Sequence, residues 1–159
     1  MSRMDELRER FPDEMTLGEA RDIVKRELRE GLKCPTCTQF AKVYRRKLNS
    51  GMAVSLIRMW RAAGTEWQHV PTTVGRRSAE EGKLRYWGLI EEETERREDG
   101  GRAGYWRVTE AGAAFVRAQA TVQSHAMIYD GDCLRLDGPY ITIQDALGGK
   151  FSYAELMRA

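Results

Sequence analysis

Two cysteines in the stretch KCPTCTQF, residues 33–40, have the spacing of a metal or redox site. Cys34 and Cys37 are separated by a proline and a threonine. Such a pair supplies either half of the four ligands of a structural zinc ion or the two thiols of a redox centre. A thioredoxin-like centre follows a strand, whereas residues 16–33 are expected to be helical, so the redox interpretation is disfavoured.

The rest of the chain offers few further ligands for zinc. It holds one more cysteine, Cys133, and two histidines, His69 and His125. His125 and Cys133 stand in one short segment with seven residues between them. The predicted metal site therefore consists of Cys34, Cys37, His125 and Cys133, and a structural zinc there would tie the N- and C-terminal segments together.

Alternatives to this ligand set stay open. His69 competes with His125, although it lies beside Trp67 in an expected core-facing turn. Asp130 or Asp132 could complete the shell in place of the histidine. Without metal, the cysteines would be unlinked thiols, because free cysteine often packs as a small apolar residue.

Capping signals in the sequence predict three helices. Thr16 with Glu19 matches a capping box and begins a helix that Gly31 can stop. Asn49 or Ser50 caps a second helix that runs to Gly64. Ser78 with Glu81 is a second capping box, which predicts a helix through about residue 87.

Apolar spacing predicts the remaining elements. The spacing of Phe40, Tyr44 and Leu48 favours a helix over 40–48, with a basic opposite face that could contact phosphates. Two strands are predicted at residues 89–95 and 105–108, on either side of a turn at 99–101. Thr109 then caps a helix. In the tail, turn signals at 130–131 and 137–138 separate short strands, and residues 150–157 read as a closing helical turn.

The order helix, strand, polar turn, strand, helix is similar to the winged-helix family, its MarR-like branch in particular. The resemblance rests on the segments KLRYWGLIEE, residues 83–92, and YWRVTEAGAAFV, residues 105–116. It covers about residues 50–120 and implies a DNA-binding helix followed by a basic wing. The arrangement also resembles uncharacterised small proteins of actinobacteriophages.

The resemblance implies which residues would contact double-stranded DNA. They lie at the start of the recognition helix, within it, and in the wing: Arg76, Arg77, Ser78, Lys83, Arg85, Arg96, Arg97 and Arg102. The alternative is a solvated surface, because Glu80, Glu81 and the glutamates at 91–93 dilute the positive charge.

The composition limits the function classes. The 159 residues are 42% hydrophobic with a net charge of +2, which predicts a folded chain whose basic surface is local. No stretch is long and apolar enough to span a membrane, and the charged N-terminus lacks the features of a signal peptide. The expectation is a cytoplasmic chain of a bacterial or phage-infected cell. No phosphate-binding loop or nucleophile motif occurs, so no enzyme is expected.

These observations predict an α+β fold. It would be a mostly helical winged helix-turn-helix with flanking N-terminal helices and a short β-rich C-terminal tail. The predicted domains are an N-terminal helical arm at 1–49, a winged-helix domain at 50–120, and a tail at 121–159 that packs on the arm. The predicted function is transcriptional control by a DNA-binding protein, for which the N-terminal helices are a candidate homodimer interface. The rival interpretation is a winged helix that binds a host or phage protein instead of DNA.

Overall fold

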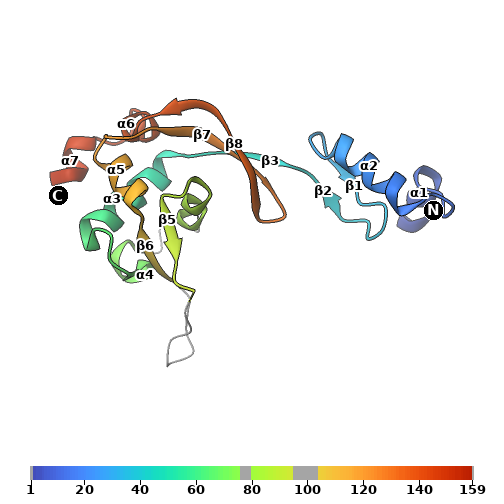
Figure 1. The fold of residues 1–159 in the computed structure, drawn as a ribbon, viewed down its shortest axis with the longest axis horizontal. Coiled ribbons are helices and arrows are strands. Elements are labelled where there is room, and N and C mark those ends of the chain that lie inside the picture. The colour runs from blue at the N-terminus through green and yellow to red at the C-terminus, as the bar shows by residue number, and fades with distance from the viewer. Residues whose placement is uncertain (1, 76–79, 95–103, 159) are drawn as a thin grey trace. The chain divides into compact units, whose positions relative to one another are not determined.

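The computed structural model describes residues 2–75, 80–94 and 104–158, and the chain divides into two compact units. Unit 1 comprises Met1–Arg45 and Met127–Leu134, and unit 2 comprises Arg46–Ala126 and Arg135–Ala159. Figure 1 labels most of the helices and strands. Over the described residues the fold is α+β, with 43% helix and 24% strand arranged in three small sheets. The prediction of a mostly helical protein is therefore wrong, because segments expected as helix or turn pair as strands.

Unit 1 begins with two short capped helices. Helix α1 spans Arg3–Arg10 and α2 spans Leu17–Glu27, and both begin with a complete capping box. In the second box, Thr16 accepts a hydrogen bond from the Glu19 amide, while the Glu19 carboxylate accepts one from the Thr16 amide. This confirms the capping box that the sequence predicts. The core of the unit is small, and it consists of Leu7, Phe11 and Leu32 with partly buried side chains of α2 against them.

The predicted helix over residues 40–48 is wrong. Strand β1, Leu32–Lys33, pairs antiparallel with β2, Phe40–Ala41, so the cysteine segment becomes the turn of a hairpin. The expectation that residues 16–33 are helical throughout, with no strand before Cys34, is therefore also wrong, because α2 ends at Glu27. Residues Tyr44–Lys47 form strand β3. The Val43 amide donates to the carbonyl of Leu28 at the end of α2, so it makes no helical bond. Strand partners from elsewhere in the chain thus override the helical spacing.

Unit 2 is arranged around the helix α3, Ser50–Ala63, which begins at Asn49 and ends at Gly64 as the sequence predicts. The elements after it are β4 (Gln68–His69), α4 (Val70–Thr73), the 3-10 helix η1 (Glu81–Trp87), β5 (Ile90–Glu92), β6 (Tyr105–Val108) and α5 (Glu110–Val116). Strand β6 lies between β4 and β5 and pairs antiparallel with both. Glu91 of β5 stands opposite Arg107 of β6.

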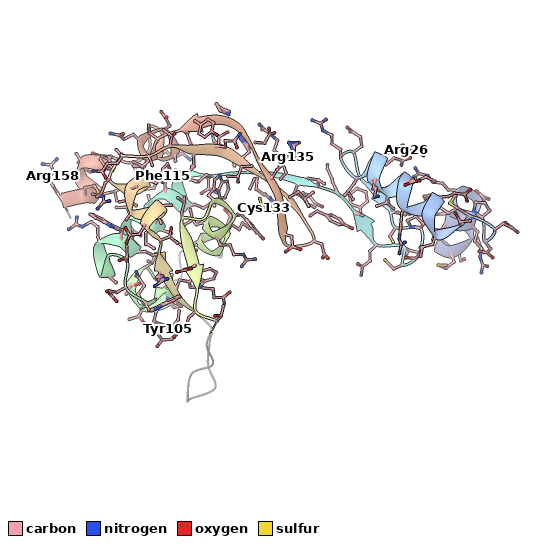
Figure 2. All side chains as sticks on the ribbon, in the orientation of Figure 1. Arg26, Tyr105, Phe115, Cys133, Arg135 and Arg158 are labelled. Atoms are coloured by element: carbon pink, nitrogen blue, oxygen red, sulfur yellow. The ribbon has the colours of Figure 1, made fainter. Side chains whose placement is uncertain are left out.

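The core of unit 2 lies along α3. This helix packs against η1, β6, α4 and α5, and against the two helices of the tail, α6 (Ile143–Leu147) and α7 (Tyr153–Arg158). The fully buried side chains include Leu56 and Ile57 of α3, Leu84 of η1 and Phe115 of α5. Figure 2 labels Phe115 among the side chains of this unit. The sequence did not predict helix α6. The closing helical turn predicted at residues 150–157 is confirmed as α7.

The segment VTEAG, residues 108–112, connects α5 to the end of η1. Thr109 caps α5 by accepting from the Gly112 amide, and its hydroxyl donates to the carbonyl of Gly88. The Thr109 amide also donates to the carbonyl of Leu89. Gly112 lies so close that an added Cβ would be 2.1 Å from the Leu89 oxygen. The motif therefore needs threonine for two hydrogen bonds and glycine for the close approach.

Strands β7 (Val122–Tyr129) and β8 (Asp132–Ile141) form the hairpin of the tail, with the sheet order β3-β7-β8. Asp130 and Gly131 both have positive φ, as a tight hairpin turn requires, so this predicted turn is confirmed. The turn expected at Asp137–Gly138 is wrong, because β8 continues through both residues. The carbonyl of Gly138 accepts from the side chain of Gln123 on β7.

The boundaries predicted at 49/50 and 120/121, and the packing of the tail on the N-terminal arm, stay predictions. Within unit 2, α6 and α7 contact α3. In the described part of the chain, no helix is both long enough and apolar enough to pass through a membrane.

Candidate functional site

Two of the predicted DNA contacts are described, and both lie on η1. Lys83 and Arg85 belong to Glu81–Trp87, which is a 3-10 helix in place of the expected α-helix. Its N-cap residue, Glu80, makes no side-chain cap. The other predicted contacts lie outside the described residues: Arg76, Arg77, Ser78, Arg96, Arg97 and Arg102.

Lys83 is held in a small polar network at the start of η1. Its ammonium group donates to the Glu80 carboxylate at 3.1 Å. The Glu80 carboxylate also accepts from the side-chain amide of Asn49 at 2.8 Å. Asn49 in turn caps α3 by accepting from the Met52 amide. The sequence predicts the cap, but only the fold shows that the same amide connects α3 to η1.

These contacts lower the pKa of the Glu80 carboxyl below its usual value. The largest cause is the hydrogen bond from Asn49, followed by the hydrogen bond and the positive charge of Lys83. Arg46 adds a weaker attraction. Each contact favours the ionised form, and together they outweigh the small effect of burial.

Replacing Glu80 by glutamine should flatten the acid side of the stability profile. A carboxyl whose pKa is lowered on folding stabilises the fold above its unfolded pKa, and this contribution is lost as pH falls through the folded pKa. We expect Glu80→Gln to lower the free energy of unfolding at pH 7 by about 0.5–1 kcal/mol, because the exposed carboxylate is screened by solvent. Urea denaturation at pH 7 and pH 3 measures this, and a difference that is the same at both values would contradict the role of the charge.

A second basic group lies on strand β6, where sequence reasoning did not place a candidate. The guanidinium of Arg107 pairs with the Glu91 carboxylate and stacks 4.7 Å from the ring centroid of Trp67. Trp67 is 41% exposed. The strand register places Arg107 opposite Glu91, so the period-two pattern of β5 and β6 could have indicated this pair.

The cysteine segment forms a closed turn at the end of the β1–β2 hairpin. The Cys34 amide donates to the carbonyl of Gln39 at 2.7 Å, and the Thr38 amide donates to the carbonyl of Cys34 at 3.1 Å. Thr38 has φ of 66°, which lets the chain reverse directly after Cys37. The turn is therefore defined by backbone hydrogen bonds, and both cysteines stand on it.

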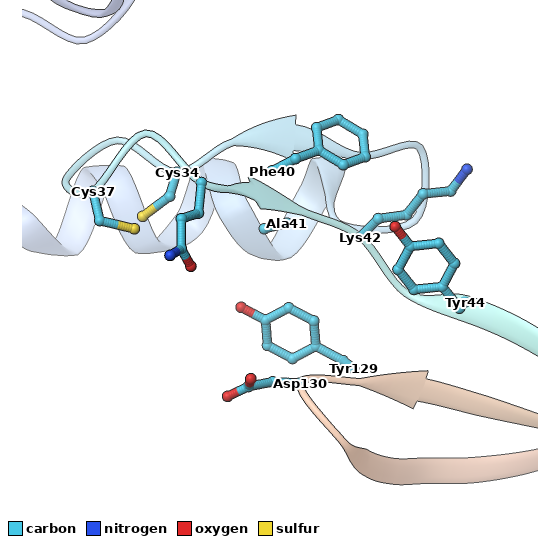
Figure 3. Close-up of a pocket in the computed structure, with 9 residues that line it drawn as sticks. Cys34, Cys37, Phe40, Ala41, Lys42, Tyr44, Tyr129 and Asp130 are labelled. Carbon is cyan, nitrogen blue, oxygen red and sulfur yellow. The ribbon is translucent and has the colours of Figure 1, made fainter. Parts of the chain in front are cut away.

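The two thiols face each other across this turn, as Figure 3 shows. The Cys34 sulfur lies 3.2 Å from the Thr36 hydroxyl. Hydrogen bonds from Thr36, from the backbone of Cys37 and from the Cys37 side chain lower the pKa of Cys34 to about 7. A cavity of about 330 Å³ opens in front of the pair, and Lys42, Tyr129 and Asp130 contribute to its walls.

The other two predicted zinc ligands stand on the hairpin of the tail. Cys133 lies near the start of β8 in unit 1, and His125 lies on β7 in unit 2. The Nδ1 atom of His125 is 2.6 Å from the Ser124 hydroxyl. No disulfide links the three cysteines. Among the described residues, no three side chains of His, Cys, Asp or Glu are grouped as a metal site, and the zinc set stays a prediction.

Comparisons with models of protein families, with curated proteins and with solved structures find no match. The resemblance to the winged-helix family therefore stays a prediction from the residues quoted above.

Proposed function

We propose that unit 2 binds double-stranded DNA through η1 and through the segment that joins β5 to β6, and that the chain acts in transcriptional control. The observation that carries this proposal is the order of the elements η1, β5, β6 and α5, with β5 and β6 paired antiparallel. A helix that leads into a strand hairpin is the arrangement that the family resemblance implies for DNA binding. The proposal places the chain in the cytoplasm of a bacterial or phage-infected cell.

The charges on these elements support the proposal. Lys83 and Arg85 lie on η1, and Arg46 is close enough to Glu80 to attract its carboxylate. The sequence adds Arg96, Arg97 and Arg102 between β5 and β6. Lysine and arginine side chains supply most of the affinity for a phosphate backbone.

A rival function is supported by the pairing of these same charges. Lys83 is bonded to Glu80, and Arg107 is paired with Glu91. Such pairs reduce the positive potential that a phosphate would meet. Unit 2 would then bind a host or phage protein and have no affinity for DNA.

Fluorescence anisotropy with a labelled random duplex separates the two functions. We expect binding at low salt whose logarithm of affinity falls linearly with the logarithm of salt concentration. The double variant Lys83→Gln with Arg85→Gln should weaken binding and reduce the slope by about 1 for each phosphate that is no longer neutralised.

A matched control for this experiment is Lys150→Gln, which removes one charge from an exposed position between α6 and α7. This variant should leave the slope of log affinity against log salt concentration unchanged. A variant in which Arg96, Arg97 and Arg102 become glutamine tests the wing prediction in the same assay. Absence of binding to the duplex at low salt would rule out DNA as the partner and favour the rival function.

A further inference from the structure

We propose that the Cys34–Cys37 turn is half of a zinc site completed by a second copy of this chain. Each copy supplies two thiolates, and four sulfurs from two identical turns enclose one Zn²⁺ tetrahedrally. The proposal differs from the zinc set within one chain, and it does not rest on DNA binding.

The turn places its two sulfurs together at one cavity. Both cysteines line one cavity, and the two sulfurs face each other there (Figure 3). The Cys34 sulfur lies 3.2 Å from the Thr36 hydroxyl. The hydrogen bonds from Cys34 to Gln39 and from Thr38 to Cys34 hold the backbone of the turn.

The pair is accessible from outside the chain. Cys37 is exposed and Cys34 is partly exposed, on a turn at the end of a two-stranded hairpin. A structural zinc site requires four ligands, and this turn supplies two of them. A second copy related by a two-fold axis would present an identical pair, so the same surface serves both partners.

A four-sulfur site fixes the protons released and the charge of the complex. Binding follows Zn²⁺ + 4 RSH → [Zn(SR)₄]²⁻ + 4 H⁺, so each copy releases two protons and the complex carries two negative charges. Lys42 and Asp130 both line the cavity with the two cysteines, so the walls of the cavity carry one positive and one negative side chain.

An apolar groove beside the turn gives a second copy a surface to cover. The groove has a volume of about 320 Å³, and its walls include Leu17, Val24, Leu28, Pro35 and Tyr129 together with Cys34. Leu17 is 56% exposed. Because the groove shares Cys34 with the metal half-site, a copy that brings its cysteines to this point would also bury apolar surface.

Metal titration of the full chain, followed by light scattering, tests the proposal. The protein is purified without chelator, stripped of metal under reducing conditions and titrated with Co²⁺ and then Zn²⁺. We expect saturation at one metal for two chains, with the sulfur-to-cobalt charge-transfer absorption of a four-sulfur site. Metal should double the mass from the 18.2 kDa of one chain, and EDTA should reverse the change.

Four variants distinguish this site from the competing ones. Cys34→Ser and Cys37→Ser should each abolish both the charge-transfer band and the doubling of mass. Cys133→Ser is the matched control, and His125→Gln is a second control; both should behave as the parent chain does. Circular dichroism of each variant establishes that the chain is folded.

Three results would overturn the proposal. One metal per chain with no change in mass, and with loss of binding in Cys133→Ser or His125→Gln, would assign the site to one chain. Doubling of mass without metal would show a dimer that does not use the thiols. Failure to bind Co²⁺ or Zn²⁺ at micromolar concentrations would leave Cys34 and Cys37 as plain thiols.

Discussion

Replacing Trp87 by alanine is expected to lower the free energy of unfolding of unit 2 by about 3–5 kcal/mol. Trp87 ends η1 and is only 6% exposed. Its indole N–H donates to the carbonyl of Gln123 at 2.6 Å, which connects η1 to strand β7. The variant removes a large buried ring and leaves that carbonyl without its indole donor. Thermal unfolding should show a fall in Tm of roughly 10 °C or more.

Two further tryptophan variants separate packing from hydrogen bonding. Trp87→Phe keeps most of the ring but removes the N–H, so we expect a loss of about 1–3 kcal/mol. Trp67→Ala is the matched control, because Trp67 is 41% exposed and stacks on the guanidinium of Arg107 at the surface. Its loss should be about 1 kcal/mol or less. Equal losses for Trp87→Ala and Trp67→Ala would contradict the place of Trp87 in the core.

Replacing Gly112 by alanine is expected to destabilise unit 2 by at least about 3 kcal/mol, at the upper end of overpacking effects. The added Cβ would lie 2.1 Å from the Leu89 oxygen and 2.7 Å from a methyl carbon of Val108. The Leu89 carbonyl cannot easily move away, because it accepts from the Thr109 amide at 3.0 Å. Helix α5 would have to shift away from β5.

The matched control for this variant is Gly51→Ala in the first turn of α3. There the nearest atom to an added Cβ is the Asn49 side-chain oxygen at 3.4 Å, and the position is exposed. Alanine favours a helix over glycine by about 1 kcal/mol, so this variant should be neutral or slightly more stable. Urea denaturation of both variants measures the difference. A Gly112→Ala chain as stable as Gly51→Ala would contradict the close contact of α5 with Leu89.

The sequence predicted the elements that depend on neighbouring residues. The capping box of Thr16 and Glu19, the cap at Asn49 and the cap at Thr109 are all present. The strand at residues 105–108 is also present with the expected bounds. A cap involves a side chain and an amide three residues away, so the residues that decide it are adjacent in the sequence.

The predictions from the sequence were wrong for segments whose structure depends on pairing with another strand. Residues 40–48 have helical spacing, yet they form β2 and β3, because β1 and β7 offer them backbone hydrogen bonds. Asp137–Gly138 has turn composition, yet β8 runs through it beside β7. Helical spacing and turn composition do not report strand pairing, and for β3 the partner strand β7 lies far along the chain, so a mostly helical fold was expected.

The candidate sites show the same difference between local features, which the sequence supplies, and side-chain partners, which the fold supplies. The sequence by itself singled out Cys34 and Cys37 by their spacing, and the family resemblance implied Lys83 and Arg85 as DNA contacts. Only the tertiary structure joined Lys83, Glu80 and Asn49 into one network, and only it stacked Arg107 on Trp67. It also made the cysteine segment the turn of the β1–β2 hairpin, where the two sulfurs face each other. Residue types and short spacings are properties of the sequence, whereas the partners of a side chain depend on which distant segments the fold brings within hydrogen-bonding distance.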